Sequence, residues 1–272
     1  MAALLSRPPA DRDDQVERRS CLRQLLGLGA LGLGGCASRL PQTEASSAEA
    51  AGAVVPFSTA AVGNQVPAGW QPYVMRRDKP ITQYSIVPDD NRAVLQAKSH
   101  SAASGLRCPV RIDPHQTAQL RFSWRVQHVA TQVCVDAPDS DDSPARVVLA
   151  FDGDMARLSL RDRLLFDQVE LFTGQRIPYA TLMYVWDGSL PPETLVHNHR
   201  TSRIRYLTVE SGTQRAGRWL RYERDVVADF RRAFGEAPGL ITSVGVLTDS
   251  DATKQDFQTW YGDISLDRPR KA

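Results

Sequence analysis

The stretch AQLRFSWRVQHV, residues 118–129, alternates apolar and polar side chains. Leu120, Phe122, Trp124 and Val126 fall on one side of an extended chain, and the polar residues between them fall on the other. Successive side chains of a strand point to opposite faces of a sheet, so this pattern is typical of a strand with one buried face and one solvated face. It predicts a sheet that packs one face against a core.

Strand-like segments lie on both sides of this stretch. ITQYSIV (81–87) and AVLQAKS (93–99) are separated by the turn-forming residues PDDN (88–91), which is a hairpin signature. ARVVLAF (145–151) is a continuous apolar run, as expected of a fully buried strand. The same series continues with YATLMYVWDG, SRIRYLTVES, GRWLRYERD, LITSVGVLTD and FQTWYGDISL. Strands of this length at this spacing predict a mainly β protein with a β-sandwich.

The segment SLRDRLLFDQVELF, residues 159–172, has the spacing of a helix. Its apolar residues recur three to four positions apart, which predicts a buried stripe. The stripe comprises Leu160, Leu164, Leu165, Gln168 or Val169, and Phe172. We expect this helix to be an insertion that covers an edge or end of the sandwich.

A second helical insertion is predicted in DVVADFRRAFG, residues 225–235. Asp225 is an N-cap candidate, and Gly235 is a residue at which helices commonly end. Val226, Phe230 and Phe234 fall on one side. The predicted fold is therefore a β-sandwich with two helical insertions.

The N-terminal region has the organisation of a secretion signal. Arg18 and Arg19 precede an apolar run from Leu25 to Gly35, and Cys36 follows it. Eleven residues at about 1.5 Å each cannot cross a bilayer core of roughly 30 Å. The alternative of a buried amphipathic helix is disfavoured because the run is rich in glycine, which costs about 1 kcal/mol per residue in a helix interior. We expect residues 1–35 to be a signal peptide.

Leu33-Gly34-Gly35-Cys36 resembles a bacterial lipobox, in which the Cys is acylated and becomes the new N-terminus. This resemblance implies a lipid anchor on Cys36 and therefore a membrane as a partner. The next residue is Ala37 rather than Asp, so the usual signal for retention in the inner membrane is missing. We expect an exported protein that faces the periplasm, on the outer membrane in preference to the inner one.

RRSCLR, residues 18–23, resembles the twin-arginine export motif. Arg18 and Arg19 match the motif, whereas Cys21 and Arg23 stand where Phe and Lys are usual. Paired arginines are also an ordinary feature of signal peptides, so export by the general route stays open.

The rest of the chain divides into three parts. Residues 36–53 are rich in Ala, Ser and Glu with no apolar period, which predicts a flexible tether. Residues 54–267 form the predicted single β-sandwich domain, and residues 268–272 form a tail.

Seven segments together resemble the bacterial domain of unknown function 3047 family. They are PFSTAAVGNQVPAGWQPY, LRFSWRV, DDSPARVVLAFD, YVWDG, NHRTSRIRYLTVESG, GRWLRYERDVVADFRRAFG and LTDSDATKQDFQTWYGDISL, in order within residues 54–267. The family is uncharacterised, so the resemblance implies no reaction. It implies a jelly-roll-like β-sandwich, similar in outline to carbohydrate-binding and galactose-binding-like modules.

Two cysteines, Cys108 and Cys134, remain in the predicted domain. Both lie in strand-like segments, and an exported protein reaches an oxidising compartment, so a disulfide between them is one interpretation. Two buried free thiols are the other, because Cys is often a core residue.

Exposed aromatic rings are candidates for binding sugars. Trp124 and Trp260 alternate with apolar residues, which predicts that both are core residues. Tyr184 and Trp186 share a face of their strand near its end, and Trp219 alternates with charged residues. We select Trp186, Trp219 and Tyr184 as candidate ligand contacts, with core packing as the alternative for each.

Aspartates gather in DAPDSDD (136–142), in DGD (152–154) and in LTDSDATKQDFQTWYGDISL (247–266). Asp249, Asp251 and Asp263 of the third segment are candidates for a shared cation site, and structural calcium is the cofactor considered. An EF-hand is excluded because Lys254 and Trp260 occupy its required Gly and Glu positions. The alternative is that these residues cap turns through bonds to backbone N–H groups.

In the second half of the third segment, Phe257–Leu266, we expect one closing strand with Trp260, Ile264 and Leu266 inward and Asp263 outward.

Three function classes stay open. The first is a non-catalytic binding domain for a polar ligand such as a glycan, or for a protein of the cell envelope. The second is an envelope hydrolase with carboxylate catalysis, and the third is a purely structural lipoprotein.

No catalytic residue is selected: no Gly-x-Ser-x-Gly motif occurs, and the pair His197 and His199 lacks a third metal ligand nearby in sequence. A formal net charge of +2 gives no indication of a nucleic-acid partner.

Overall fold

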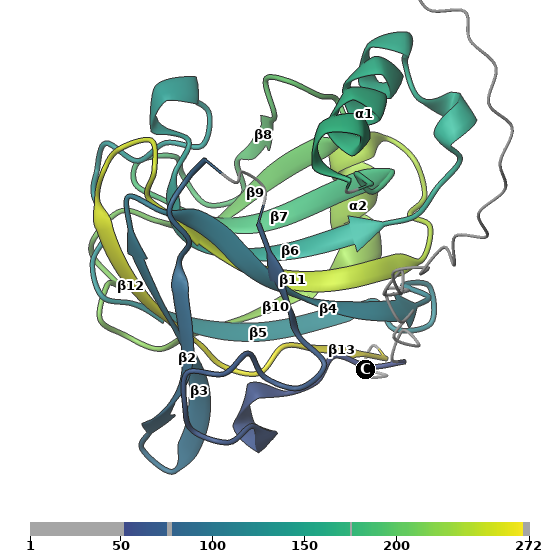
Figure 1. Cartoon of the computed structure of the whole chain (residues 1–272). Coiled ribbons are helices and arrows are strands. Elements are labelled where there is room, and N and C mark those ends of the chain that lie inside the picture. Colours follow the sequence, from purple (N-terminus) through teal and green to yellow (C-terminus); the bar gives the residue numbers. More distant parts are fainter. Residues whose placement is uncertain (1–51, 75–77, 175, 269–272) are drawn as a thin grey trace, which may run out of the picture. The chain divides into compact units, whose positions relative to one another are not determined.

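Two β-sheets lie face to face in the computed structural model, as Figure 1 shows. The structure describes residues 52–74, 78–174 and 176–268, which all belong to one compact unit, Ser47–Ala272. The predicted signal peptide, Cys36 and all of the tether before residue 52 lie outside the described residues. The predicted mainly β sandwich with two α-helices is confirmed.

The larger sheet has seven strands in the order β1-β4-β11-β6-β7-β9-β8. Neighbouring strands are antiparallel, except that β7 and β9 are parallel. Its strands are β1 (Gln71–Tyr73), β4 (Ala103–Ile112), β6 (Ser143–Phe151), β7 (Ala180–Asp187), β8 (Leu195–His197), β9 (Ile204–Ser211) and β11 (Ile241–Asp249).

The smaller sheet has six strands. Five follow the order β10-β5-β12-β3-β2, and β13 pairs with β5. Its strands are β2 (Gln83–Asp89), β3 (Arg92–His100), β5 (Gln119–Val126), β10 (Leu220–Asp225), β12 (Asp256–Tyr261) and β13 (Ser265–Asp267). Strands β2 and β3 form the predicted hairpin, which turns at Asp90 and Asn91.

The core lies between the inner faces of the two sheets. The alternation predicted for residues 118–129 is confirmed, because Leu120, Phe122, Trp124 and Val126 are all buried. Aromatic rings join the sheets: Phe122 lies 5.8 Å from Tyr184 of β7, centroid to centroid, and Trp124 lies 6.4 Å from Trp186. Such pairs contribute about 0.5–1.5 kcal/mol beyond the burial of their area.

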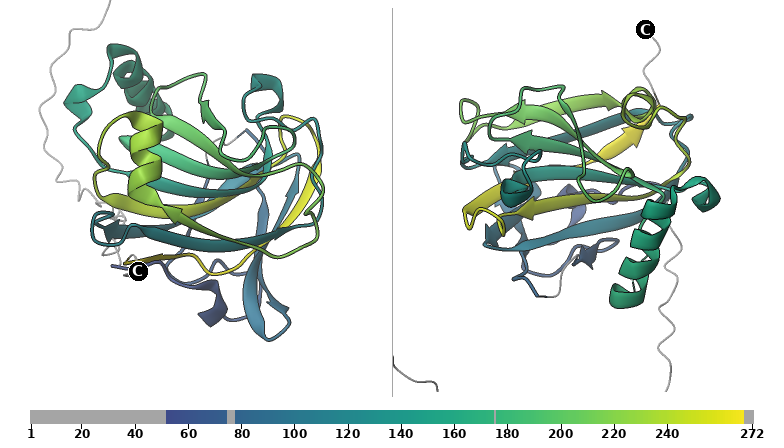
Figure 2. Two further views of the ribbon diagram at one scale, coloured as in Figure 1. Left: turned by 180° about the vertical axis from the view of Figure 1, so that it is seen from behind. Right: turned by 90° about the horizontal axis from the view of Figure 1, so that it is seen from above.

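Helix α2 (Val226–Phe234) forms as predicted and lies across strands of the larger sheet in Figure 2. The Asp225 side chain accepts a hydrogen bond from the backbone N–H of Ala228, and Gly235 ends the helix in the left-handed conformation. Phe230 is fully buried and its ring lies 4.6 Å from that of Phe151 on β6. The helix thus adds apolar side chains to the core.

Helix α1 (Leu160–Thr173) forms where it was predicted, but the predicted stripe is wrong in part: Leu165 packs against the core and Val169 is half-buried, whereas the other apolar members are exposed. Leu160, Leu164, Leu171 and Phe172 are all at least 60% exposed, and α1 projects away from the sheets in Figure 2. The helix is held on its opposite side by buried Phe166 and by a hydrogen-bonded Asp162. Hydrogen bonds therefore replace part of the apolar contact that the sequence pattern implied.

The expected single strand Phe257–Leu266 is also wrong. The segment is broken at residues 262–264 into β12 and β13. Phe257, Thr259 and Tyr261 point inward from β12, so Trp260 points outward and is half-buried. Ile264 is buried as predicted, and Leu266 packs against the core while half-buried.

The short 3₁₀ helices are η1 (Phe57–Thr59), η2 (Pro138–Ser140) and η3 (Met155–Arg157). Within the described residues, no helix has the length and apolar character needed to span a membrane.

Candidate functional site

Two of the predicted ligand contacts are core residues, which corrects the prediction. Trp186 and Tyr184 are both fully buried between the sheets. Trp186 donates a hydrogen bond to the carbonyl oxygen of Gly212, and the Tyr184 hydroxyl donates one to Asp229. Even-numbered residues of β7 face the core, so neither ring can contact a ligand in this structure.

Trp219, the third predicted contact, lies half-buried immediately before β10. It is part of a surface that we call the tryptophan face, which comprises Asp89, Arg92, Arg125, Trp219 and Trp260 on the outer side of the smaller sheet. The Arg125 guanidinium lies over both indoles, 4.3 Å from the Trp260 centroid and 5.4 Å from the Trp219 centroid. Arg92 covers Trp219 at 4.4 Å. Cations over aromatic faces are attracted by the ring quadrupole, so the four side chains form one ordered stack.

The sheet register assembles the tryptophan face. Trp260 on β12 is the direct partner of Arg125 on β5, and Asp89 on β2 is the partner of Arg92 on β3. Asp89 accepts hydrogen bonds of 2.7 Å from the Trp219 indole and from Arg125. One carboxylate therefore fixes both an aromatic ring and a cation.

The outward position of Trp260 was not predicted from the sequence, because the alternation of side chains was assumed to continue without a break through Gly262. A glycine inside a strand pattern often marks a bulge or a break. Here an added Cβ on Gly262 would lie 2.3 Å from the Ser123 hydroxyl, so the chain passes close to β5 at this point. Reading Gly262 as a break would have separated β12 and put Trp260 on the outer face.

The predicted aspartates do not gather as a set. Asp249 and Asp251 lie together, and the third carboxylate beside them is Asp142, with one oxygen of each within 4.8 Å of the others. Asp263 lies elsewhere and accepts hydrogen bonds from the backbone and the hydroxyl of Ser58. Two turns far apart in sequence thus meet, which sequence spacing alone could not indicate.

The oxygens of this acidic group already have partners. Asp142 accepts from Ala252 N–H, and from the N–H and hydroxyl of Thr253. The ammonium group of Lys79 lies 2.9 Å from Asp251. These contacts agree with the alternative that the aspartates cap turns.

Arg146 is a buried cation beside Asp249 of this group. Its guanidinium lies 3.0 Å from Asp249 and 3.2 Å from Asp141. Burial raises the pKa of Asp249 to about 8; Arg146 opposes this rise, while Asp142 and Asp141 add to it. Arg146 thus links Asp249 to the segment 136–142 through a largely buried set of ion pairs.

Neither the cysteines nor the histidines form a site. Cys108 and Cys134 are free thiols, as in the second of the two interpretations, although only Cys108 is fully buried. Cys108 points into the core from β4, whereas Cys134 lies in the loop after β5 and not in a strand. His197 and His199 are exposed, and His199 contacts the Asp136 carbonyl.

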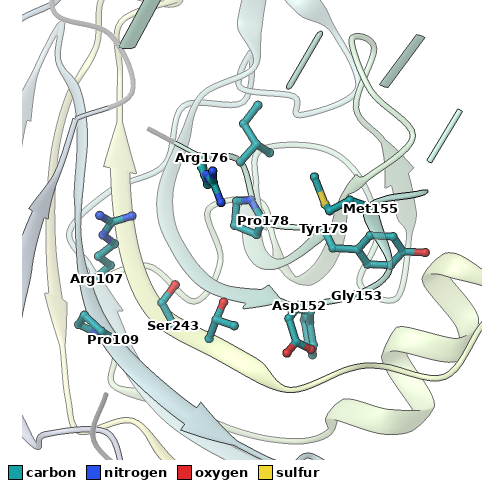
Figure 3. A pocket seen from close by; sticks show the side chains of 12 residues that line it. Arg107, Pro109, Asp152, Gly153, Met155, Arg176, Pro178, Tyr179 and Ser243 are labelled. Carbon is teal, nitrogen blue, oxygen red and sulfur yellow. The ribbon is translucent and has the colours of Figure 1, made fainter. Parts of the chain in front are cut away.

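A pocket of about 410 Å³ lies on the outer face of the larger sheet, below the segment that follows α1 (Figure 3). Among the described residues that line it, the only carboxylate is that of Asp152. Asp152 accepts a hydrogen bond of 2.5 Å from the N–H of Leu240. The Tyr179 hydroxyl is directed out of the pocket, toward Glu236.

The family model described as "Protein of unknown function (DUF3047)" matches residues 68–265. The chain therefore belongs to this family, as the resemblance predicted. A comparison with curated proteins finds no match.

Solved structures with a similar chain trace include glycoside hydrolases. The chain is similar to endoglucanase 3 from family GH12 of Trichoderma harzianum, with 7% identity, coverage of 74% of this chain and 98% of that chain, and a TM-score of 0.36. It is similar to the xyloglucanase domain of NopAA, a type three effector from Sinorhizobium fredii in complex with cellobiose, with 8% identity, coverage of 76% and 96%, and a TM-score of 0.39. It is also similar to the family 11 xylanase from Neocallimastix patriciarum, with 9% identity, coverage of 79% and 94%, and a TM-score of 0.30.

Proposed function

We propose that this protein is exported, is anchored to a membrane by lipid on Cys36, and binds a glycan on the tryptophan face without cleaving it. The observation that carries the glycan role is the pair of half-buried indoles, Trp219 and Trp260, on one sheet face. Indoles are large and apolar with one polar edge, and arginines already lie over these two rings, so a sugar would contact the parts of the rings that remain exposed beside the guanidinium groups.

Polar groups for sugar hydroxyls lie beside the rings. Arg92 and Arg125 offer N–H donors, and Gln96 is the cross-strand partner of Trp260. Because Asp89 holds Trp219 and Arg125 by hydrogen bonds, less side-chain freedom is lost when a ligand binds. A pre-ordered surface that combines aromatic rings with hydrogen-bond donors supports a binding role.

The hydrolase alternative has less support. Glycosidases that use two carboxylates hold them about 5–9.5 Å apart across a cleft. The lining of the pocket offers one carboxylate, Asp152, and that group is bonded to the backbone. Asp249 has a raised pKa, but its side chain is 7% exposed and is engaged by Arg146 and Ser143. Neither carboxylate is placed to act on a bound chain.

A glycan array tests the binding role. We expect residues 47–272 to bind at least one glycan class, and Trp219→Ala and Trp260→Ala each to weaken binding several-fold, up to ~10-fold. Phe172→Ala is a matched control because Phe172 is an aromatic residue on α1 that is 75% exposed. A folded domain that binds no glycan would sink the proposal, and capture of an envelope protein through the same two residues would favour the protein-partner alternative.

Membrane fractionation with metabolic lipid labelling tests the anchor. We expect Cys36→Ser to abolish labelling and release the protein from membranes, since the proposed acylation requires that thiol. Cys21→Ser is the matched control, because Cys21 lies in the segment expected to be removed. A Cys36→Ser protein that stays membrane-bound would refute lipid anchoring.

A further inference from the structure

The pocket in Figure 3 is separate from the tryptophan face, because it opens on the outer side of the other sheet. Its volume of about 410 Å³ falls within the ~300–1,000 Å³ that is usual for sites of small ligands. Its lining combines basic, hydroxyl, acidic and apolar groups. The arrangement of these groups defines what could bind.

Arg107 supplies the basic end. It points outward from β4, and no ion pair joins it to a carboxylate among the described residues. Its Nε is buried with no hydrogen-bond partner, while Tyr73 packs 5.4 Å from the guanidinium. Because Nε is enclosed, a ligand in the pocket would be bound by the terminal nitrogens of this guanidinium, which can donate charge-assisted hydrogen bonds to a carboxylate.

Arg107 has Gly245 as its register partner on β11, so no β11 side chain stands directly opposite it on the outer face. Arg176 lies above Arg107 in Figure 3, on the segment that follows α1, and its Nε is bonded to Glu170 at 2.9 Å. The Arg176 side chain is 86% exposed and pairs with Glu170 in solvent, so Arg107 is the more enclosed cation of the pocket.

Two hydroxyls line the floor because β11 is irregular. Neighbouring residues of a regular strand point to opposite faces, yet both Thr242 and Ser243 line the pocket. The register of β11 shifts between Ile241 and Ser243 against both neighbouring strands, which is the mark of a bulge. Bulges re-aim side chains next to functional sites.

Asp152 faces the pocket from the side opposite Arg107. One of its oxygens accepts from Leu240 N–H, which leaves the other for a hydroxyl donor. A compact dianion such as phosphate would be repelled by the carboxylate of Asp152. A ligand with one carboxylate and several hydroxyls could instead place its carboxylate at Arg107 and a hydroxyl at Asp152. Met155 and Pro178 add an apolar wall for carbon-bound hydrogens.

We propose that this pocket binds a sugar acid: a carboxylate that contacts Arg107, and hydroxyls that contact Ser243, Thr242 and Asp152. The proposal does not rest on glycan binding by the tryptophan face, since the two surfaces share no residue.

Titration of residues 47–272 with D-glucuronate, followed by NMR or calorimetry, tests the proposal. We expect saturable binding, and Arg107→Gln to weaken it at least ~10-fold through loss of a charge-assisted hydrogen bond. Arg221→Gln, at an exposed arginine of β10, is the matched control and should leave binding unchanged. D-glucose and inorganic phosphate should bind at least ~10-fold more weakly, because glucose lacks the carboxylate and phosphate lacks the sugar hydroxyls.

Several outcomes would overturn the proposal. Absence of glucuronate binding, equal binding by Arg107→Gln, or equal affinity for glucose or phosphate would each do so. Ser243→Ala provides a second variant if Arg107→Gln does not fold, and it should weaken binding several-fold. Trp219→Ala should leave glucuronate binding intact, so this result is separable from a failure of the tryptophan face.

Discussion

Nη2 of Arg146 lies 3.0 Å from Oδ2 of Asp249, and both side chains are almost withdrawn from solvent, at 3% and 7% exposure. Burial of Asp249 penalises its charged form more than Arg146 favours it, so the pKa is raised to about 8. The pKa of Asp in an unfolded chain is about 3.9. The folded state therefore holds a proton on Asp249 over a pH range in which the unfolded chain does not.

This difference predicts a pH-dependent stability. A carboxyl whose pKa is raised on folding stabilises the fold below its unfolded pKa, and that stability is lost as the pH rises toward the folded value. Burial also raises the pKa of Asp141, which acts in the same direction. We expect the free energy of unfolding to fall from about pH 4 to pH 8, and Asp249→Asn to reduce this fall. Urea titrations across this range would measure it, and an equal slope in the variant would contradict it.

Asp162 has the opposite behaviour. Burial disfavours its charge, but hydrogen bonds from Ser202, Thr201 and Ser159 outweigh burial and lower the pKa to about 2. Stability from this group is present above its unfolded pKa and is lost as the pH falls through about 2. We expect Asp162→Asn to cost about 2 kcal/mol at neutral pH, with a smaller difference near pH 2. Asp167→Asn on the exposed side of α1 should cost within ~0.5 kcal/mol, and equal costs for the two variants would contradict the prediction.

Substitutions on the two sides of α1 should differ greatly in how much they lower the free energy of unfolding. Leu164 is 60% exposed, so Leu164→Gln should change the free energy of unfolding by no more than about 0.5 kcal/mol. Phe166 is 4% exposed, so Phe166→Ala should cost about 3–5 kcal/mol. Denaturant unfolding would measure both. A large cost for Leu164→Gln would show that the apolar side predicted from the sequence spacing is buried after all.

The difference between the two sides of α1 illustrates which features of the fold could be predicted from the sequence. Strands and the capped helix α2 were predictable because their signals are local, in alternation, in Asp225 and in Gly235. Helix α1 was located correctly, but its buried side depends on hydrogen bonds from Thr201 and Ser202 to Asp162. Those partners lie some 40 residues away, and apolar spacing carries no information about them.

The candidate sites were less predictable for a geometric reason. Side-chain direction in a strand has a period of two, so one irregular residue reverses every direction beyond it. The break after Tyr261 put Trp260 outside, and the bulge after Ile241 put both Thr242 and Ser243 in the pocket. On β7 every residue is buried, so apolar character could not show that Tyr184 and Trp186 face the core.

Calcium should not stabilise the domain through the acidic group. Calcium requires about six to eight oxygen ligands. Arg146 and Lys79 are bonded to Asp249 and Asp251, and Asp142 is bonded to backbone N–H groups. We expect millimolar calcium or a chelator to leave the unfolding temperature unchanged within about 2 °C, less than the ~2–4 °C that accompanies 1 kcal/mol in a domain of this size. A calcium-dependent rise that Asp142→Asn removes would instead establish a metal site.

Asp89 should determine the order of Trp219 on the tryptophan face. It accepts hydrogen bonds of 2.7 Å from Trp219 and from Arg125, and its side chain is 12% exposed. Asp89→Asn preserves size but removes the charge that holds both groups, so we expect a cost of ~1 kcal/mol or less and greater acrylamide quenching of tryptophan fluorescence. A Trp219→Phe background should abolish the added quenching, which assigns it to that ring. Asp90→Asn is the matched control, since Asp90 lies at the hairpin turn with a φ of 52°, which Asn tolerates. Unchanged quenching in Asp89→Asn would show that the stacked arginines alone hold the indole.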